Sequence, residues 1–416
     1  MPTGLTDFTT GSDTYYIRFT YNTANQSIVQ INEGDTLLPY EPYYDEKVLP
    51  AESFIQEVAE SITKEYSPYY HGPFVISKSQ FSEFYKGLQD TYSGLELNRS
   101  TVYSTVISLF DDLVAAAPEY VSKKALGTAS GTDANDQPYT IYEYVFKPKH
   151  QTSSLSDKKV PVILLDGCIH GFEKCSTYGL YLFAKDLVEN WDKNEALKNV
   201  RCHTEIHIIP VVNPYGFDNN TYKNANGVNI NRNFYGTDWV SSEDPSSSDY
   251  NGLEPFDQPE STIIRDWIFD NDERILFYAN CHTNGQYNAT GYAEMNACMS
   301  STDRNDEYFN KIYNCFVRHI DEQTLLWPSM YENITLSASV MCGHIQSSPT
   351  EGNAGGYAAA WAEDYNNVVA MTLEGFNGLY ANSQTQVVPL FSADALKINS
   401  ENIGNMVIQM LYEFAE

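Results

Sequence analysis

The chain has 416 residues, of which 42% are hydrophobic, and a formal net charge of −30 from 55 acidic and 25 basic residues. This acidic balance argues against non-specific binding to nucleic acid or to an anionic membrane, because both need clustered Lys and Arg. No run reaches the roughly 18–20 apolar residues that span a bilayer, and the first residues lack the pattern of a signal peptide. The seven cysteines have no small-scaffold spacing and predict reduced, buried thiols.

The N-terminal segment, residues 1–45, carries a β pattern. Apolar and polar residues alternate from residue 14, and the segment ends in the Tyr/Pro-rich "LLPYEPYYDE". We expect two short strands and an extended linker, a β appendage too small to bury a core of its own. The segment resembles the last strands of β-sandwich modules in phage-tail and bacterial surface proteins. Residues 46–95 have helical spacing, as in "AESFIQEVAESITKEY", and predict a helical linker region.

The remaining residues, 96–416, have the pattern of an α/β domain. A helix is expected over 99–119, closed by Pro118. A hairpin region rich in Gly, Asp and Asn follows, and then the alternating "YTIYEYVFKP" predicts a strand. "STYGLYLFAKDLVENW" predicts an amphipathic helix capped by Ser176. From residue 160 onward, apolar runs alternate with helices, which is typical of a sheet covered on both faces.

Four of the apolar runs end at a residue with useful chemistry. Ligands of open α/β sheets bind beyond the carboxyl ends of the strands, so these end residues are expected to share one site. The runs cover 160–169, 205–212, 275–281 and 367–373, and they end at His170, Asn213, His282 and Glu374.

His170, Glu173 and His282 have the ligand chemistry of a catalytic zinc. Two histidines and one carboxylate, with one position open, form the ligand set of such a site. The short spacer between His170 and Glu173 lets one turn present both. The open position would hold a water whose pKa the metal lowers to roughly 7. Glu374 is the expected general base, which takes a proton from that water and returns it to the leaving group.

The segment "NANGVNINRNF" (224–234) supplies a carboxylate-binding group. Arg232 offers a guanidinium fork and Asn231 an amide, a pair suited to bidentate capture of a carboxylate. A zinc-activated water, a general base and a carboxylate clamp together predict hydrolysis of a peptide beside its free C-terminus.

The motifs "HGFE", "NPYGF", "NANGVNINRNF", "CHTNG" and "MTLEGF", in this order, resemble the zinc carboxypeptidases of the carboxypeptidase A type, over about residues 100–416. The resemblance implies an α/β fold with a mixed, mostly parallel eight-stranded twisted sheet between helices. It also implies one zinc ion (Zn2+) per chain and a clamp for the substrate carboxylate. The implied zinc ligands are His170, Glu173 and His282, the base is Glu374, and the clamp is Asn231 with Arg232.

Three positions depart from the family pattern. The family commonly has an arginine upstream of the Asn-Arg pair, where this chain has Lys223, which can stabilise an oxyanion only as a point charge. Phe172 stands where some relatives use arginine to bind substrate. The mobile tyrosine of the family has no clear counterpart. Glu351 lies near that place, and we consider it both as a candidate substrate contact and as an ordinary loop carboxylate.

Other histidines and cysteines have simpler interpretations. His203 and His207 in "HTEIH" imitate the spacing of a helical zinc motif, but the segment runs into a β pattern, where this spacing gives no helical proximity. We expect both to be structural. Cys168 and Cys175 flank His170, and their spacing fits no common Cys/His metal module, so we expect buried, inert thiols.

The leading functional hypothesis is a zinc exopeptidase, a metallocarboxypeptidase that acts on peptides with a free C-terminus, including cell-wall peptides. The alternatives are a zinc amidase or deacylase on the same scaffold, and a catalytically weakened binding module of a tail or surface assembly. The β appendage favours an extracellular, cell-surface or virion-associated location within a larger assembly. The sequence leaves the side-chain preference of the substrate open.

Overall fold

A computed structural model of the protein describes most of the predicted α/β region and short stretches elsewhere. The described residues are 7–10, 15–22, 26–33, 85, 96–147, 162–236, 239–242, 244–271, 274–283, 296–299, 345–347, 356–366, 368–375, 379–381 and 385–414. Among them, no helix is long and apolar enough to cross a membrane. The chain divides into two compact units, residues 1–67 and 68–416.

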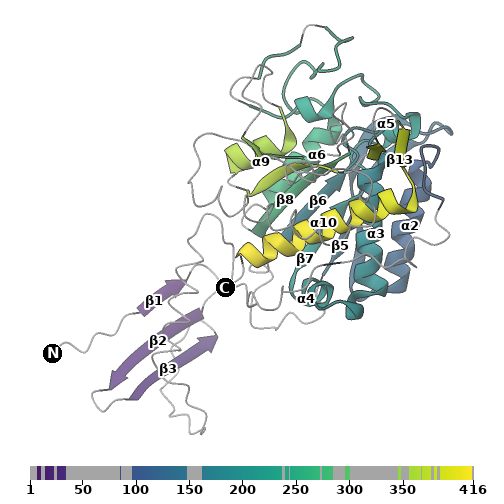
Figure 1. The fold of residues 1–416 in the computed structure, drawn as a ribbon. Helices are drawn as coiled ribbons and strands as arrows, with labels where there is room; N and C mark the ends of the chain where they lie inside the picture. The colour runs from purple at the N-terminus through teal and green to yellow at the C-terminus, as the bar shows by residue number, and fades with distance from the viewer. Residues whose placement is uncertain are drawn as a thin grey trace. The chain divides into compact units, whose positions relative to one another are not determined.

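The first unit contains a three-stranded antiparallel sheet, shown in purple in Figure 1. Its strands are β1 (Asp7–Thr10), β2 (Tyr15–Asn22) and β3 (Gln26–Glu33), in the order β1-β2-β3. β2 and β3 form a hairpin with Tyr15 opposite Glu33 and Asn22 opposite Gln26. The two strands expected from the alternating pattern are therefore present, and β1 is an additional strand. The predicted helical linker lies almost wholly outside the described residues, so the domain boundaries stay predictions.

The second unit contains one large mixed sheet, with strand order β10-β9-β11-β8-β6-β7-β5-β4. Its central strands β11, β8, β6 and β7 are parallel, whereas β5 and β4 add antiparallel at one edge. This is the mixed, mostly parallel α/β fold that the sequence predicted. The strands are β4 (Val121–Thr132), β5 (Pro138–Phe146), β6 (Val162–Gly167), β7 (Glu205–Ile209), β8 (Ile275–His282), β9 (Asn296–Met299), β10 (Ile345–Ser347) and β11 (Ala370–Glu374).

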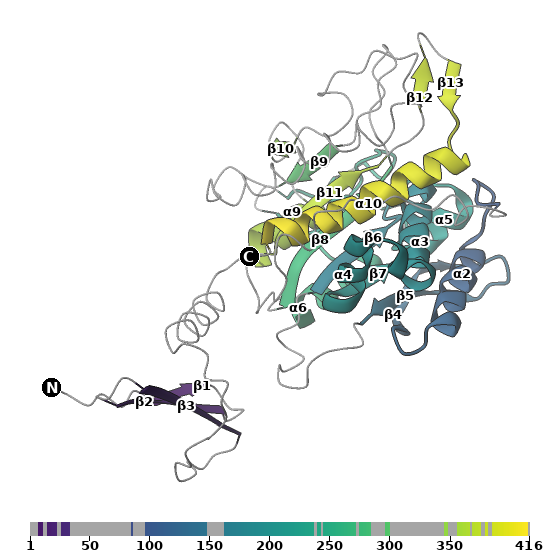
Figure 2. The ribbon, with the colours of Figure 1, turned by 60° about the horizontal axis from the view of Figure 1, so that its bottom comes forward.

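Helices cover both faces of this sheet (Figure 1). One face carries α2, α3, α4 and α10, and the other carries α6 and α9. Figure 2 shows α10 lying along α3. Their bounds are α2 (Tyr103–Ala116), α3 (Lys174–Glu189), α4 (Glu195–His203), α6 (Pro259–Asn271), α9 (Ala358–Asn366) and α10 (Ala393–Phe414). The short helix α5 (Pro214–Asn219) and the hairpin β12 (Leu379–Ala381) with β13 (Thr385–Val388) complete the described elements.

The central strands form because their sequences are apolar on both faces. Every residue of β6, β7 and β8 is buried, which is what a parallel sheet sandwiched between helices requires. α2 likewise buries Tyr103, Val106, Ile107, Phe110 and Leu113, spaced three and four apart on one face. The helix predicted over 99–119 is therefore confirmed, and it ends just before Pro118.

The interpretation of the next helix, α3, was wrong in two respects. It begins at Lys174, so Ser176 lies inside the first turn, where its hydroxyl donates to Glu173 O at 2.8 Å and does not cap the helix. It is also buried along nearly its whole length, because α10 covers the side that the sequence predicted to be exposed. A pattern of mixed polarity therefore concealed a helix that packs against both α10 and the sheet strands β6 and β8.

Candidate metal centre

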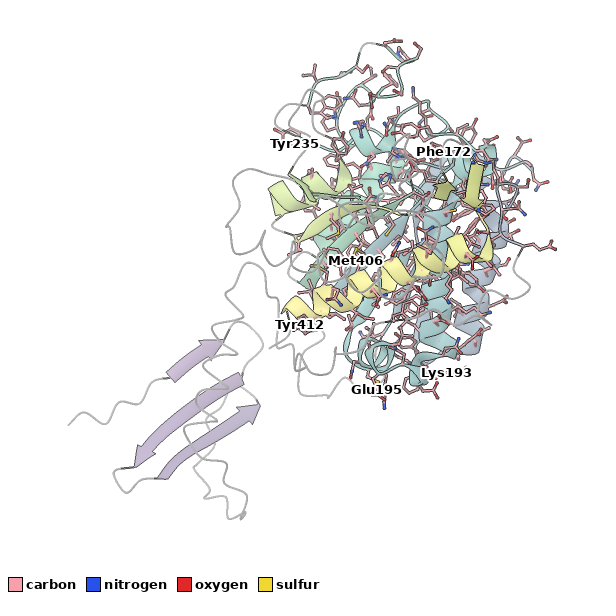
Figure 3. All side chains as sticks on the ribbon, viewed as in Figure 1. Phe172, Lys193, Glu195, Tyr235, Met406 and Tyr412 are labelled. Atoms are coloured by element: carbon pink, nitrogen blue, oxygen red, sulfur yellow. The ribbon has the colours of Figure 1, made fainter. Side chains whose placement is uncertain are left out.

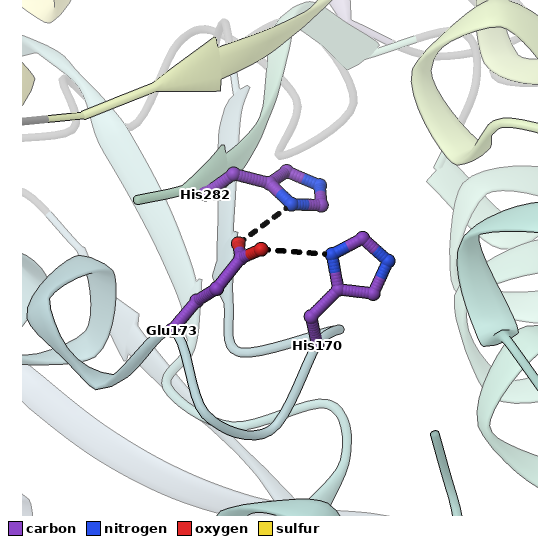
Figure 4. A group of neighbouring side chains, drawn as sticks. All are labelled: His170, Glu173 and His282. Atoms are coloured by element: carbon purple, nitrogen blue, oxygen red, sulfur yellow. Dashed lines mark hydrogen bonds and ion pairs between the residues drawn. The ribbon is translucent and has the colours of Figure 1, made fainter. Parts of the chain in front are cut away.

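Three side chains with metal-binding atoms meet at the carboxyl ends of β6 and β8. His170 lies in the loop after β6, Glu173 directly precedes α3, and His282 is the last residue of β8. Their ligand atoms all lie within 4.8 Å of one another, and all three residues are buried. Figure 4 shows both imidazole rings beside the Glu173 carboxylate. These three residues are called the metal centre below.

The loop between β6 and α3 is tightly held. Cys168 has a φ of 49°, in the left-handed region that non-glycine residues rarely adopt, so the chain turns sharply after β6. Asn213 N donates to Cys168 O at 3.0 Å. A Cβ on Gly171 would overlap the backbone of Gly216 in α5, so only glycine permits this close approach. The strand end and α5 thus fix the path of the loop that presents His170.

The Glu173 carboxylate lies between the two histidines. His170 Nδ1 is 3.1 Å from Oε1, and His282 Nδ1 is 2.9 Å from Oε2. Burial alone would raise the pKa of Glu173, but the charges and hydrogen bonds of the two histidines lower it well below its usual range. Burial lowers the pKa of His170. At neutral pH the carboxylate is therefore ionised and the His170 imidazole neutral, which are the forms that bind metals.

Two amide oxygens lie behind the rings, one at the Nε2 atom of each histidine. Asn229 Oδ1 lies 3.1 Å from His170 Nε2, and its amide nitrogen donates to a backbone carbonyl at 3.3 Å. Asn280 Oδ1 lies 2.6 Å from His282 Nε2, and its amide nitrogen donates to Asp166 at 2.6 Å. Amide oxygens only accept hydrogen bonds, so each of them can accept a hydrogen carried on Nε2.

This arrangement fits a bound cation. With its hydrogen on Nε2, each ring turns its Nδ1 lone pair toward the Glu173 carboxylate, so that the three residues offer converging acceptors. Buried acceptors of this kind need a donor or a metal ion. Two imidazole nitrogens and one carboxylate are the protein ligands of a common catalytic zinc site. His170, Glu173 and His282 therefore fit the group that the sequence implied.

A buried chain of hydrogen bonds connects β6 to His282. Tyr278 OH donates to Asp166 Oδ2 at 2.7 Å, and Asn280 Nδ2 donates to Asp166 Oδ1. Burial raises the pKa of Asp166 to about 6, although both hydrogen bonds act to lower it. Asp166 orients the Asn280 amide, and this amide orients the His282 ring. Groups behind metal ligands in this way position the ligands and tune metal affinity.

The predicted base, Glu374, is placed by strand pairing. It is the last residue of β11, which runs parallel to β8, and its backbone is in register with His282. The two residues therefore leave the sheet side by side at the same edge. The Glu374 side chain lies outside the described residues, as does the whole of Glu351, so the roles of both stay predictions.

Asn231 lies beside His282 in a short turn, Ile230–Arg232. Its Nδ2 is 3.3 Å from His282 Nε2, and its Oδ1 accepts a hydrogen bond from Ala358 N at 3.0 Å. The first residue of α9 thus holds the amide on the His282 side of the metal centre.

The Arg232 guanidinium is held on three sides. Nη1 donates to Asn231 O at 2.9 Å, Nε lies 3.3 Å from Asp249 Oδ1, and the Tyr357 ring lies 4.0 Å from the guanidinium carbon. Among the described residues, Arg232 Nη2 has no hydrogen-bond partner. The structure therefore brings Asn231 and Arg232 to the metal centre and fixes the guanidinium without filling its outer edge.

Lys223 is directed elsewhere. Its amine donates to Pro245 O at 3.0 Å, and the structure gives it no contact with the described metal ligands. The neighbouring Tyr222 stacks instead on His170, with ring centroids 3.8 Å apart and an interplanar angle of 21°. Phe172 lies 5.7 Å from the Tyr222 ring. Aromatic rings thus occupy the side of His170 where the sequence suggested a cation.

Cys168 and Cys175 are free, buried thiols, as predicted. Burial raises the pKa of each to about 12, so both are neutral at physiological pH and neither is a metal ligand.

Sequence reasoning missed the residues behind the ligands, Asn229, Asn280 and Asp166. Asn280 could have been found, because it lies two positions before His282 and residues two apart share a face of a strand. Asn229 directly precedes the turn Ile230–Arg232 and lies in no strand, so that rule does not reach it. Asp166 gave no signal, because a single acid within an apolar run has many structural uses.

Comparisons with known proteins agree with this geometry. The family model described as zinc carboxypeptidase matches residues 106–384. Among curated proteins, carboxypeptidase B of Helicoverpa zea is 28% identical over 159 residues, covering 33% of this chain and 35% of that protein. Metallocarboxypeptidase A of Trichophyton tonsurans is 27% identical over 176 residues, covering 37% of this chain and 40% of that protein. The matched regions thus span well under half of these two relatives.

Among solved structures, the carboxypeptidase A of Helicoverpa armigera superposes with a TM-score of 0.55 at 18% sequence identity. The match covers 79% of each chain. At this identity the likeness concerns the fold.

Proposed function

Because the chain belongs to the zinc carboxypeptidase family, we propose that it removes C-terminal residues from peptides by zinc-dependent hydrolysis. The observation that supports this most directly is the convergence of His170, Glu173 and His282, with both Nδ1 atoms facing the carboxylate. Held by these three residues, zinc would supply a Lewis acid that polarises the scissile carbonyl and makes a water nucleophilic near neutral pH.

In this proposal Glu374 moves the proton. Its backbone is in register with that of the zinc ligand His282, which supports a position within reach of the reacting water. The carboxylate would accept a proton from the attacking water and deliver it to the leaving amine. A general base of this kind contributes about 10²- to 10⁴-fold to the rate.

Asn231 and Arg232 would bind the free C-terminal carboxylate of the substrate. Charge complementarity supports this role, since a fixed guanidinium beside the metal centre suits bidentate capture of an anion. Glu351 is proposed as an additional substrate contact. Lys223 can act on the oxyanion only after its amine leaves Pro245 O, so we assign it a lesser role than Arg232.

The test of this function combines two comparisons. Glu374→Gln should keep one zinc per chain and lose turnover by about 10²- to 10⁴-fold; normal turnover would remove Glu374 from the mechanism. Peptides with a free C-terminus should be cleaved and their amidated counterparts should not. Cleavage of both would indicate an endopeptidase, and cleavage of N-acyl amino acids alone would indicate a deacylase.

We further propose that the natural substrates include cell-wall peptides and that the first unit attaches the enzyme to a larger extracellular or virion assembly. The support is the separate β1–β3 sheet, which lies in a compact unit of its own. Muropeptides in the substrate screen test the first part. Co-sedimentation of the full chain with purified cell walls tests the second.

A further inference from the structure

Residues 224–234, called the clamp segment below, carry three side chains of the proposed site. Asn229 and Asn231 contact the two histidines of the metal centre, and Arg232 is the proposed ligand of the substrate carboxylate. The only regular structure in this segment is the short turn Ile230–Arg232. Its shape therefore depends on contacts with other elements of the second unit.

The start of the clamp segment is tied to the N-terminal end of α6. Asn224 is buried, and its Nδ2 donates to Glu260 Oε2 at 3.0 Å and to Gln258 Oε1 at 2.9 Å. Its Oδ1 accepts hydrogen bonds from Asn226 N at 3.1 Å and from Val228 N at 3.0 Å. One buried amide therefore folds the start of the segment into a compact turn and joins this turn to α6.

The other end of the clamp segment is tied to the same end of α6. Asn233 Oδ1 accepts hydrogen bonds from Gln258 N at 3.2 Å and from Ser261 Oγ at 2.6 Å. Figure 3 shows Tyr235, which follows the segment, on the α9 side of the second unit. Residues 257–261, called the α6 frame below, thus hold both ends of the segment and fix the path between them.

Glu260 is the charged side chain at the centre of these contacts. It is fully buried, and no ion pair joins it to a basic residue in the described part of the chain. Its Oε1 accepts from Ser130 N at 2.8 Å and from Ser130 Oγ at 2.5 Å, and its Oε2 accepts from Asn224. A buried carboxyl group costs free energy unless hydrogen bonds satisfy it. Because each of these partners is a donor, an amide in place of the carboxylate would set one donor against another.

We propose that the α6 frame positions Asn231 and Arg232 for the substrate carboxylate, with Glu260 as its main positioning residue. This inference rests on the proposed carboxypeptidase function. Glu260 contacts none of the described metal ligands and acts through Asn224. A displacement of about 1 Å at a binding group can cost about 100-fold, so a disturbed frame should weaken recognition of the carboxylate.

The experiment compares the tripeptide Ala-Phe-Leu with its C-terminal amide, using the zinc-loaded full chain. For calorimetric dissociation constants each chain also carries Glu374→Gln, so that the peptide is not consumed. We expect Glu260→Gln to reduce the preference for the free carboxylate by at least about tenfold. In chains that keep Glu374, KM for the free peptide should rise by the same factor and kcat should stay nearly unchanged.

Two further variants complete the design. Asp266→Asn is the matched control, because it also exchanges a carboxylate for an amide on α6, at an exposed pair with Arg265. It should retain the wild-type preference. Ser261→Ala removes one hydrogen bond to Asn233 and should reduce the preference by about two- to tenfold. It decides the question if Glu260→Gln does not fold.

The wild type tests the proposed function, and the variants test the frame. Hydrolysis of no peptide would contradict the carboxypeptidase function, while the binding preference would still decide the role of the frame. Equal binding of both peptides by the wild type would remove the carboxylate clamp and the inference with it. An unchanged preference in folded Glu260→Gln, even with a lower unfolding free energy, would overturn the inference alone. So would an unchanged preference in Ser261→Ala if Glu260→Gln does not fold.

Discussion

Two buried clusters in the second unit are built from carboxylates and imidazoles, but in opposite proportions. The metal centre has one carboxylate between two imidazoles. The second cluster, called the His207 cluster, has one imidazole between two carboxylates: His207 Nδ1 contacts Glu143, and Nε2 lies 2.8 Å from Glu205. Arg274 Nη2 lies 2.8 Å from the other Glu205 oxygen.

The difference lies in what each imidazole nitrogen faces. In the His207 cluster both nitrogens face carboxylates, so a doubly protonated ring satisfies the site, and Arg274 supplies the second positive charge. In the metal centre the Nε2 atoms face the amide oxygens of Asn229 and Asn280, so a hydrogen on Nε2 leaves the Nδ1 lone pair available to a metal. The first arrangement neutralises itself, whereas the second can take a cation at the Nδ1 atoms. The partner of the far nitrogen thus separates a structural cluster from a metal site.

The largest expected effect comes from removing one ligand of the metal centre. His282→Ala should reduce bound zinc from one per chain to nearly none, because two ligands rarely retain the metal. Peptide hydrolysis should fall by at least about 10³-fold. His207→Gln is the matched control and should keep its zinc. Metal analysis and steady-state kinetics measure both. Full zinc occupancy in His282→Ala would contradict the assignment.

Glu143→Leu should disturb the His207 cluster and spare the zinc. It removes one carboxylate from a buried ion pair and leaves the Trp267 indole, which donates to it at 2.5 Å, without its acceptor. Breaking a buried pair costs about 3–5 kcal/mol, which urea unfolding would measure. Glu195→Gln, at an exposed pair with Lys198, should change stability by less than about 0.5 kcal/mol. Equal losses of unfolding free energy in Glu143→Leu and Glu195→Gln would show that a buried ion pair contributes no more to stability than an exposed one.

Asn280→Leu removes the amide that lies behind the His282 ring. Without the amide oxygen the His282 ring loses the acceptor that fixes its tautomer, so zinc affinity should fall by about 10- to 100-fold. Chelator competition measures this. Cys281→Ala lies on the same strand between Asn280 and His282 and points to the opposite face, so it should leave the affinity unchanged. Equal affinities for Asn280→Leu and wild type would remove Asn280 from metal binding.

The smallest effect is the pH dependence of the His207 cluster. Burial alone would lower the pKa of His207, but its hydrogen bonds to Glu143 and Glu205 raise it above the usual 6.5. A raised histidine pKa stabilises the fold below 6.5, and this contribution is lost as the pH rises through the folded-state pKa. For Glu205, burial alone would raise the pKa, but His207 and Arg274 lower it from 4.5 to about 2. Its contribution is present above 4.5 and lost as the pH falls toward 2.

The cluster is therefore most stabilising between pH 4.5 and 6.5. We expect the difference in unfolding free energy between wild type and His207→Gln to be largest there and to shrink toward alkaline pH. Denaturant titrations across this range provide the measurement. A difference that stays constant with pH would mean that the pKa of His207 is the same in the folded and unfolded states.

The fold was predictable where one physical requirement governs a whole segment. Strands buried on both faces must be apolar throughout, so the runs around β6, β7, β8 and β11 were visible in the sequence. The end of each run then placed a chemically useful residue. Burial of α3 was not predictable, because it depends on α10, more than 200 residues later in the chain.

For the candidate site, the ligands were predictable and the partners behind them were not. The ligands follow strand ends, and this regularity holds for His170 and His282. The partners behind them depend on pairing between strands: Asn280 on β8 meets Asp166 on β6 only because of the parallel register. Lys223, by contrast, is a residue that the sequence singled out and the structure directs away from the metal ligands. Its charge suggested catalysis, but its amine binds a carbonyl of a loop whose path the local sequence does not determine.

The close approach of Gly171 to Gly216 has an evolutionary consequence. Neither position can gain a side chain while the other segment stays in place, so the turn that carries the first zinc ligand and the start of α5 can change only together. Residues 221–227 follow α5 closely and make no such approach, so side-chain changes there should be tolerated more readily than at either glycine.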